Sequence, residues 1–544
     1  MLRRLILRSK WALLMAALTV SVADARPQTA AAPQGPPAPL FQTADTCLAC
    51  HNGLSSPSGE DISIGFDWRA TMMANASRDP YWHAGVRRET LDHPQARAAI
   101  EDECSICHMP MAHYETKAQG REAEIFAHLP INQDTELNRL AADGVSCTTC
   151  HQIENQNLGT RESFVGRFVV SPAVTMGERR IYGPFQIDAG RTRIMRSATR
   201  FTPTEGTHIQ QSELCATCHT LYTKALGPDG QAIGELPEQV PYQEWLHSAY
   251  RQEKSCQACH MPAVADVPIT SVLGDPRPNL ARHTFVGGNF FMLSMLNRYR
   301  NELGVVALPQ EMTASVNRTL AHLQTETARV SIVRAEPDAG RLTVDVAVRN
   351  LGGHKLPTAY PSRRAWLHVV VRDGNGRVVF ESGAINPQGA IQGNDNDADA
   401  SRYEPHYTEI TSADQVQIYE SMMAGPNGAL TTGLLTAVQF VKDNRLLPRG
   451  FNKETAGPDI AVHGEAREDS DFTDAGDTVR YSVPLGGAPG PFQIEAELWF
   501  QPISYRWAAN LRQYNSDETR RFNAYYDSMA SSSAVILARA SATR

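Results

Sequence analysis

Three features common in proteins of this length are missing from the sequence. No cysteine stands outside a Cys-x-x-Cys pair, no apolar run after residue 25 is long enough to cross a membrane, and no excess of basic residues exists, since 59 acidic residues face 51 basic ones. The first absence argues against a framework of scattered disulfides. The second predicts no membrane span in the mature chain. The third argues against nucleic-acid binding, which needs a basic surface to replace counterions.

The N-terminal residues are organised like an export signal. A basic segment (1–10) precedes an apolar stretch (11–23), and Ala23-Asp-Ala25 supplies a small-x-small cleavage site. The apolar stretch is shorter than the roughly 20 residues that span a bilayer, which favours a cleaved signal peptide over a retained anchor. Cleavage after residue 25 removes four basic residues and one acidic residue, and lowers the formal charge from −8 to −11. We therefore expect an exported, periplasmic protein.

All ten cysteines fall in five Cys-x-x-Cys pairs, and a histidine follows each pair at once. The motifs are Cys47–His51, Cys104–His108, Cys147–His151, Cys215–His219 and Cys256–His260. Disulfides or structural zinc would account for the pairs but not for the histidine after every pair, and five pairs cannot be shared evenly among four-ligand zinc sites. Cysteines three apart lie on one face of a helical turn, so both thiols can reach one porphyrin while the next histidine binds its iron.

The sequence therefore predicts five c-type haems, each containing iron. The predicted points of covalent attachment are Cys47, Cys50, Cys104, Cys107, Cys147, Cys150, Cys215, Cys218, Cys256 and Cys259. The predicted proximal iron ligands are His51, His108, His151, His219 and His260. The segment from the first motif to the end of the last (47–260) provides only about 43 residues for each predicted haem. An ordinary domain uses far more residues. We expect the haems to form much of the core of a mostly helical, loop-rich domain.

The second face of each iron decides whether a haem only carries electrons or also binds a substrate. Twelve histidines lie outside the motifs. The favoured distal ligands are His93, His113, His208, His283 and His354. Alternatives for the first haem are Met72, Met73 and His83, while His128 and His247 are expected to pack against neighbours. His354 lies far beyond the last motif, in a Gly-Gly-His-Lys-Leu-Pro loop that either reaches back to a haem or makes an ordinary contact.

The residues after 327 have a different pattern. Apolar and polar residues alternate in runs such as 341–348, 366–372 and 492–500, which predicts strands with one buried face, and Asp373-Gly-Asn-Gly376 predicts a hairpin turn. We expect an antiparallel β-sandwich over about 328–502, closed by a helix near 515–529.

An acidic segment within this predicted sandwich offers carboxylates on alternate residues. Asp395, Asp397 and Asp399 suit a calcium ion if the backbone folds around them, although the glutamate of an EF-hand loop is missing. A solvated acidic loop is the alternative.

These patterns together predict an α+β multidomain chain, with a mostly helical, loop-rich multihaem cytochrome c domain followed by an antiparallel β-sandwich-like domain. The predicted divisions are a signal peptide (1–25), a Pro/Ala-rich linker (26–44), the pentahaem domain (45–300), a helical connector (301–327) and the β domain with a C-terminal helix (328–544).

Three motif segments and one loop carry a family resemblance. With 143–152, 212–220, 255–262 and the loop 353–366, the chain resembles multihaem c-type cytochromes of the cytochrome c-552/4 (cytochrome c-554-like) family. The resemblance implies electron transfer and histidine on both faces of most irons, and it supports His93, His208, His283 and His354 as ligands. Because this chain has five motifs and a long β-rich extension, it does not match the four-haem pattern of cytochrome c-554 itself haem by haem.

We expect electrons to pass between redox-protein donors and acceptors, with a membrane-bound quinol-oxidising complex as one candidate partner. The competing hypothesis is a multihaem oxidoreductase that acts on a small nitrogen or sulfur compound at one open haem. Of the two, the electron carrier is favoured over the enzyme.

Overall fold

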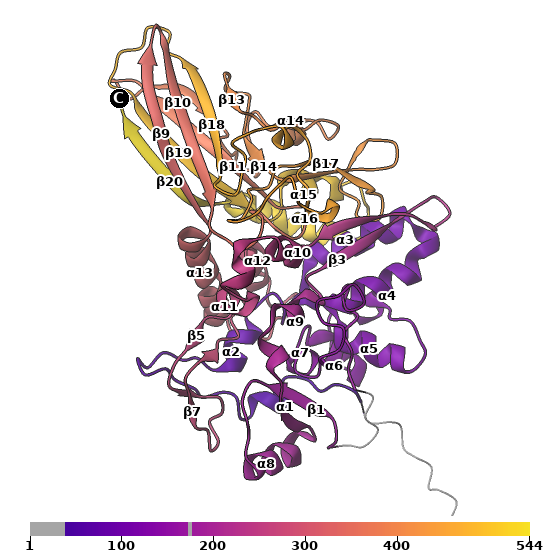
Figure 1. Ribbon diagram of the computed structural model, residues 1–544. Coiled ribbons are helices and arrows are strands. Elements are labelled where there is room, and N and C mark those ends of the chain that lie inside the picture. Colours follow the sequence, from indigo (N-terminus) through magenta and orange to yellow (C-terminus); the bar gives the residue numbers. More distant parts are fainter. Residues whose placement is uncertain (1–38, 172–176) are drawn as a thin grey trace, which may run out of the picture. The chain divides into compact units, whose positions relative to one another are not determined.

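The secondary structure changes near residue 328: helices dominate before this residue, and strands dominate after it (Figure 1). We call residues 39–327 the motif region and residues 328–544 the β region. The computed structural model describes residues 39–171 and 177–544, and Pro39–Arg544 forms one compact unit. The predicted signal peptide and most of the predicted linker lie outside the described residues. No helix in the described ranges has the length and apolar character needed to cross a membrane.

Short helices dominate the motif region. The α-helices are α1 (Asp45–Leu48), α2 (Ile64–Arg69), α3 (Pro80–Asp92), α4 (Arg97–His108), α5 (Pro110–Ala118), α6 (Glu136–Ala142), α7 (Cys147–Cys150), α8 (Ala189–Thr199), α9 (Ser212–Ala216), α10 (Pro241–Leu246), α11 (Cys256–His260), α12 (Phe290–Arg298) and α13 (Pro309–Glu326). The 3₁₀ turns are η1 (Ala76–Arg78), η2 (Pro94–Ala96), η3 (Ile125–His128), η4 (Thr207–Gln210) and η5 (Ala249–Gln252). Helix α3 begins where Pro80 fixes the first helical residue and Asp79 accepts hydrogen bonds from two backbone N–H groups.

The motif region also contains small strand pairs that the sequence did not predict. The strands are β1 (Arg180–Gly183), β2 (Thr202–Glu205), β3 (Leu221–Leu226), β4 (Ala232–Gln239), β5 (Ala263–Val264), β6 (Val267–Pro268), β7 (Pro276–Arg277) and β8 (Leu280–Ala281). β3 and β4 form an antiparallel hairpin, and β1 pairs with β2 in parallel. Phe41, at the end of the predicted linker, is fully buried in this region.

Two main sheets build the β region. Its strands are β9 (Ala328–Asp338), β10 (Arg341–Asn350), β11 (Arg364–Arg372), β12 (Val378–Ser382), β13 (Glu409–Ile410), β14 (Ile418–Tyr419), β15 (Ser421–Ala424), β16 (Leu430–Thr431), β17 (Gln439–Asp443), β18 (Asp477–Pro484), β19 (Gln493–Gln501) and β20 (Val535–Thr543). Its helices and 3₁₀ turns are α14 (Asp395–Ala398), η6 (Pro458–Ile460), η7 (Glu465–Arg467), α15 (Tyr505–Leu511), α16 (Asp517–Met529) and η8 (Ala530–Ser532).

The strand order corrects two expectations for the β region. One sheet has the order β13-β18-β10-β9 and the other β12-β11-β19-β20, with β14 also paired to β11. β13 runs parallel to β18, so the first sheet is not wholly antiparallel. The chain does not end on the predicted helix, because β20 follows α16 and pairs with β19. The face-to-face arrangement of a sandwich stays a prediction.

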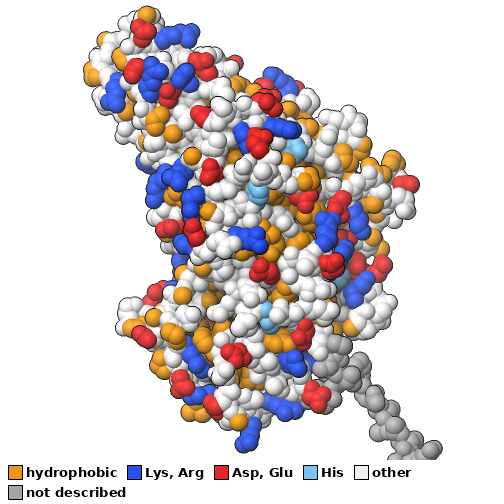
Figure 2. Space-filling view, viewed as in Figure 1, with side chains coloured by type: hydrophobic (Ala, Val, Ile, Leu, Met, Phe, Trp, Pro, Cys, Tyr) orange, Lys and Arg blue, Asp and Glu red, His pale blue; other side chains and the backbone are white. Residues whose placement is uncertain are grey.

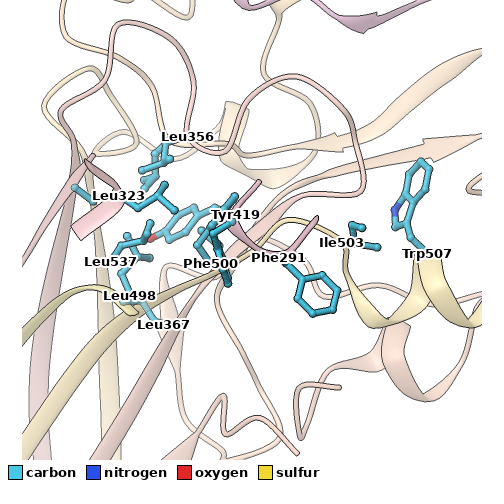
Figure 3. Close-up of a cluster of buried hydrophobic side chains, with 14 of the residues drawn as sticks. Phe291, Leu323, Leu356, Leu367, Tyr419, Leu498, Phe500, Ile503, Trp507 and Leu537 are labelled. Carbon is cyan, nitrogen blue, oxygen red and sulfur yellow. The ribbon is translucent and has the colours of Figure 1, made fainter. Parts of the chain in front are cut away.

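A shared hydrophobic core joins the two regions (Figure 3). Leu367 of β11, Leu498 of β19 and Leu537 of β20 gather near Tyr419, and Leu323 of α13 belongs to the same cluster. Each such buried apolar side chain contributes about 1.5–3 kcal/mol relative to an exposed one. The β region is therefore packed against the motif region rather than tethered to it.

Candidate haem-binding site

Four of the five motif histidines share one orientation. The Nδ1 atoms contact backbone carbonyl oxygens, as His51 with Ile269 (2.6 Å), His108 with Ala76 (3.1 Å), His151 with Tyr182 (2.6 Å) and His260 with Val286 (2.5 Å). A carbonyl only accepts, so Nδ1 carries the hydrogen and Nε2 keeps a lone pair for a metal. Burial lowers the pKa of His108 and His260 to about 4, which favours the neutral imidazole that an iron needs.

Two motif histidines each face a second imidazole from a distant segment. The ring centres of His151 and His283 are 6.2 Å apart with 22° between the planes, and those of His260 and His354 are 6.2 Å apart with 13° between the planes. Metal–imidazole bonds are about 2.0–2.1 Å long, so two imidazoles on opposite sides of one metal have ring centres about 6 Å apart. The third and fifth motifs therefore fit an iron held between two histidines.

The partner imidazoles have the orientation that this fit requires. Nδ1 of His283 contacts the carbonyl oxygen of Ala281 (3.1 Å), and Nδ1 of His354 contacts that of Lys355 (3.0 Å). Both rings therefore leave Nε2 free, as the motif histidines do. His322 of α13, which the sequence did not suggest, also lies 6.3 Å from His260, but its plane is tilted by 52°.

The structure does not bring the other predicted distal ligands into ring contact with a motif histidine. His93 is buried with no hydrogen-bond partner for Nε2 among the described residues, which is an environment that suits a metal ligand. His208 donates from Nε2 to the carbonyl of Ile153 (2.9 Å), so only Nδ1 remains available. Nδ1 of His113 contacts the Ser105 hydroxyl (2.9 Å). The iron that each of these histidines would serve stays a prediction.

Cysteines of different motifs lie side by side. A hydrogen bond between Cys47 and Cys147 lowers the pKa of Cys47 and raises that of Cys147. A second such hydrogen bond raises the pKa of Cys107 and lowers that of Cys218. A third raises the pKa of Cys215 and lowers that of Cys256. All ten cysteines are free of disulfides. The fourth motif thus adjoins both the second and the fifth, and the first adjoins the third, so the predicted haems are attached at neighbouring points.

A buried carboxylate lies close to the second motif. Glu238 of β4 is 4% exposed and accepts a hydrogen bond from the Thr223 hydroxyl. Burial, together with the nearby charge of Glu89, raises the pKa of Glu238 to about 7. Because the ionised form is disfavoured in the folded state, stability falls as the pH rises from about 4.5 through about 7.

Glu238→Gln should therefore stabilise the protein at alkaline pH. We expect an increase in the free energy of unfolding of about 3 kcal/mol at pH 8 and much less at pH 5. Denaturant unfolding followed by circular dichroism at both pH values measures this difference. Glu235→Gln, on the same strand but with 44% of its side chain exposed, is the matched control and should change little. An equal effect of Glu238→Gln at both pH values would contradict the assignment.

The three aspartates of the predicted calcium site do not converge. The Asp397 carboxylate accepts two hydrogen bonds from Arg364 (both 2.9 Å), Asp395 pairs with Arg402 (2.6 Å), and Asp399 accepts from Ser401. Asp395 and Asp397 lie in the helical turn α14, where residues two apart point to different sides. The calcium prediction therefore has no support from the structure.

Elsewhere in the β region, His406, Asp469 and Asp477 are the only described residues outside the motifs that cluster like metal ligands. Nδ1 of His406 receives N–H groups from Gln417 (2.9 Å) and Asn444 (3.1 Å). Backbone partners fix both amides, since Gln417 Oε1 accepts from Tyr407 N–H and Asn444 Oδ1 accepts from Glu420 N–H. Nε2 of His406 must then carry the hydrogen and donate it to Asp469 (3.1 Å). This cluster is a hydrogen-bond network and leaves no nitrogen lone pair for an ion.

Comparison with known proteins supports the fold. No protein-family model matches the chain, and no curated protein matches it. Among solved structures, the chain is similar to the crystal structure of a penta-heme cytochrome c552 from Thermochromatium tepidum, with 16% identity and a TM-score of 0.52 over 94% of this chain and 100% of that chain. Because the match spans almost the whole chain, the motif region and the β region together share the fold of that penta-heme cytochrome.

Proposed function

We propose that this chain is an exported c-type cytochrome that carries five haems and transfers electrons between redox proteins. One observation carries the proposal: all five Cys-x-x-Cys-His motifs are present, and two of their histidines face a second imidazole at 6.2 Å. The fold shared with a penta-heme cytochrome adds support. Haem would supply an iron that alternates between ferric and ferrous states, one electron at a time.

The chain's own residues would do three things for such a carrier. The ten cysteines attach the groups at neighbouring points, which keeps them close to one another. His151 with His283, and His260 with His354, would each hold one iron between two imidazoles, which would exclude water and substrate from those irons. Mixed charges on the viewed surface, with acidic and basic side chains interspersed, are compatible with transient docking of a redox partner (Figure 2).

The haem count is the direct test of this proposal. The full chain, expressed with an export signal and a c-type haem attachment system, is expected to carry five covalent haems. Intact-mass measurement and the pyridine haemochrome spectrum check the number. A Cys215→Ala/Cys218→Ala variant, if it accumulates, should carry four. A protein without covalent haem or Soret absorption, produced alongside a c-type cytochrome that does mature, would overturn the proposal.

The fourth motif gives the competing enzyme hypothesis a specific location. No second imidazole is in ring contact with His219 in the described structure, and the same is true of His51 and His108. Desolvation and then the charge of Arg363 lower the pKa of His219, so a guanidinium lies near this histidine. Desolvation also lowers the pKa of Arg363 to about 10. A small anion, such as an oxidised nitrogen or sulfur compound, would suit an open iron beside that cation.

Electron paramagnetic resonance of the oxidised protein separates the two functions. A carrier with all irons closed is expected to show low-spin signals alone and no carbon monoxide binding after reduction. High-spin iron that changes on addition of nitrite or sulfite, and that loses this response in Arg363→Gln but not in Arg480→Gln, would instead support the enzyme. Arg480 is a suitable control because it pairs with Asp345 (2.9 Å) at the surface of the β region.

A further inference from the structure

The loop between β10 and β11 brings His354 to the fifth motif, and it is held there by charges. Four charged side chains surround its first turn: Glu244 from α10, Lys355 from the loop itself, and Asp443 and Arg445 from the segment at the end of β17. Glu244 and Lys355 are fully buried, and Asp443 and Arg445 are 2% and 7% exposed. The two positive and two negative side chains balance each other.

The charges form one connected network. Lys355 Nζ contacts Asp443 Oδ2 (2.7 Å), and Arg445 pairs with Asp443 through Nε (2.8 Å) and Nη2 (2.7 Å). Arg445 Nη1 also lies 2.9 Å from Glu244 Oε1. Removing one member of such a buried network leaves an uncompensated charge on the others. The network therefore resists any movement that separates Lys355 from its partners.

Glu244 differs from the other three because it holds the backbone next to the imidazole. Its Oε2 accepts a hydrogen bond from the backbone N–H of Lys355 (3.0 Å), the residue directly after His354, and another from the Thr358 hydroxyl. It is also the only member that comes from the motif region. Twelve residues after Glu244 begins α11, which carries His260. One segment of the motif region (244–260) thus contains His260 and also forms hydrogen bonds with the loop that contains His354.

The opposite side of the loop packs against the same segment. A Cβ atom at Gly353 would lie 3.3 Å from Tyr250 Cβ and 3.4 Å from Trp245 Cδ1, so the loop approaches α10 and η5 closely. The Tyr250 hydroxyl donates to the carbonyl of Leu351 (2.7 Å). Asn350 closes the loop by donating to the carbonyl of His354 (2.7 Å). These contacts fix the position of the loop relative to residues 241–252.

We propose that Glu244 is a positioning residue, which holds the peptide of Lys355 and thereby sets the His354 imidazole opposite His260. The β region would then supply His354 to the fifth haem site, and this histidine would be held in place by a charge network to which the motif region contributes Glu244. This inference rests on the proposed function, because it takes His354 as the second ligand of the iron bound by His260.

The test compares Glu244→Ala with Glu244→Gln in the holoprotein. Glu244→Ala removes both the charge and the acceptor for the Lys355 N–H group. We expect up to one ferric haem in five to become high-spin, and carbon monoxide binding to rise from none to as much as one equivalent per chain. Glu244→Gln keeps an acceptor oxygen, so its irons should stay low-spin while the resonance and midpoint potential of one haem shift. A merely structural role would not give this graded response at one haem.

Two controls keep the outcomes separate. Asp397→Ala breaks the buried pair with Arg364 inside the β region and should lower stability without changing any haem spectrum. His354→Ala shows the signature of the open iron itself. If His354→Ala gives that signature while both Glu244 variants match the wild type, the positioning role is wrong and the ligand assignment stands. If neither His354→Ala nor His322→Ala/His354→Ala changes any haem signal, the ligand assignment fails. Should Glu244→Ala yield no holoprotein, an unchanged spectrum and potential in Glu244→Gln overturns the positioning role.

Discussion

Replacement of His354 by alanine is expected to open one iron in five. The imidazole of His354 lies 6.2 Å from that of His260, with the planes 13° apart, and alanine leaves no side chain that can replace it. Water or a vacant position would then face the iron, which converts it from low spin to high spin. Electron paramagnetic resonance of the oxidised protein should show a high-spin signal of about one haem per chain. The reduced protein should bind about one equivalent of carbon monoxide.

His322 makes a second variant necessary. Its ring centre lies 6.3 Å from that of His260, and it belongs to helix α13 and not to the loop of His354. If His322 moves to the iron when His354 is absent, the single variant stays low-spin and only His322→Ala/His354→Ala becomes high-spin. His247→Ala is the matched control, since this histidine contacts the carbonyl of Asn452 and lies beside Phe451 instead of a motif histidine. A low-spin double variant would contradict the role of His354.

Local spacing was sufficient for the parts of the structure that a few consecutive residues determine. The predicted helical connector (301–327) contains α13, and Asp373-Gly-Asn-Gly376 connects β11 to β12 as the predicted hairpin. The β3–β4 hairpin was missed because Gly234 and Pro237 lie inside β4, and both residues weaken a strand pattern. The parallel pairing of the two-residue strand β13 has no local signature at all.

The parts of the site that depend on contacts between distant residues could not be predicted from the sequence. His283 and His354 were candidates among many histidines, and only the fold places them opposite His151 and His260. Alternation of Asp395, Asp397 and Asp399 suggested convergence, but a helical turn separates their side chains. Glu244 gave no signal, because a glutamate on a short amphipathic helix normally faces solvent. Its ion-pair partner Arg445 lies about two hundred residues away in the chain.

Without its haems, the motif region is expected to lose its structure. Four of its motif helices, α1, α7, α9 and α11, have only four or five residues, far below the roughly 12–15 that an isolated helix needs in water. The described apolar clusters around the first three motifs are small, whereas the main core belongs chiefly to the β region and its neighbours. The haems would supply the missing apolar surface, and their iron would use imidazole nitrogens such as Nε2 of His93, which has no partner among the described residues.

Protein produced without haem attachment should therefore show a large loss of helical circular dichroism, and protease should cut it readily within 39–300. The β region should resist longer, because its inner strands pair through backbone hydrogen bonds and bury their own side chains. Mass spectrometry of the fragments, with the holoprotein digested in parallel, locates the cuts. An apoprotein as helical and as resistant as the holoprotein would mean that the polypeptide alone builds this region. The ten cysteines and their adjoining histidines would then be features of a folded protein, not the points around which it folds.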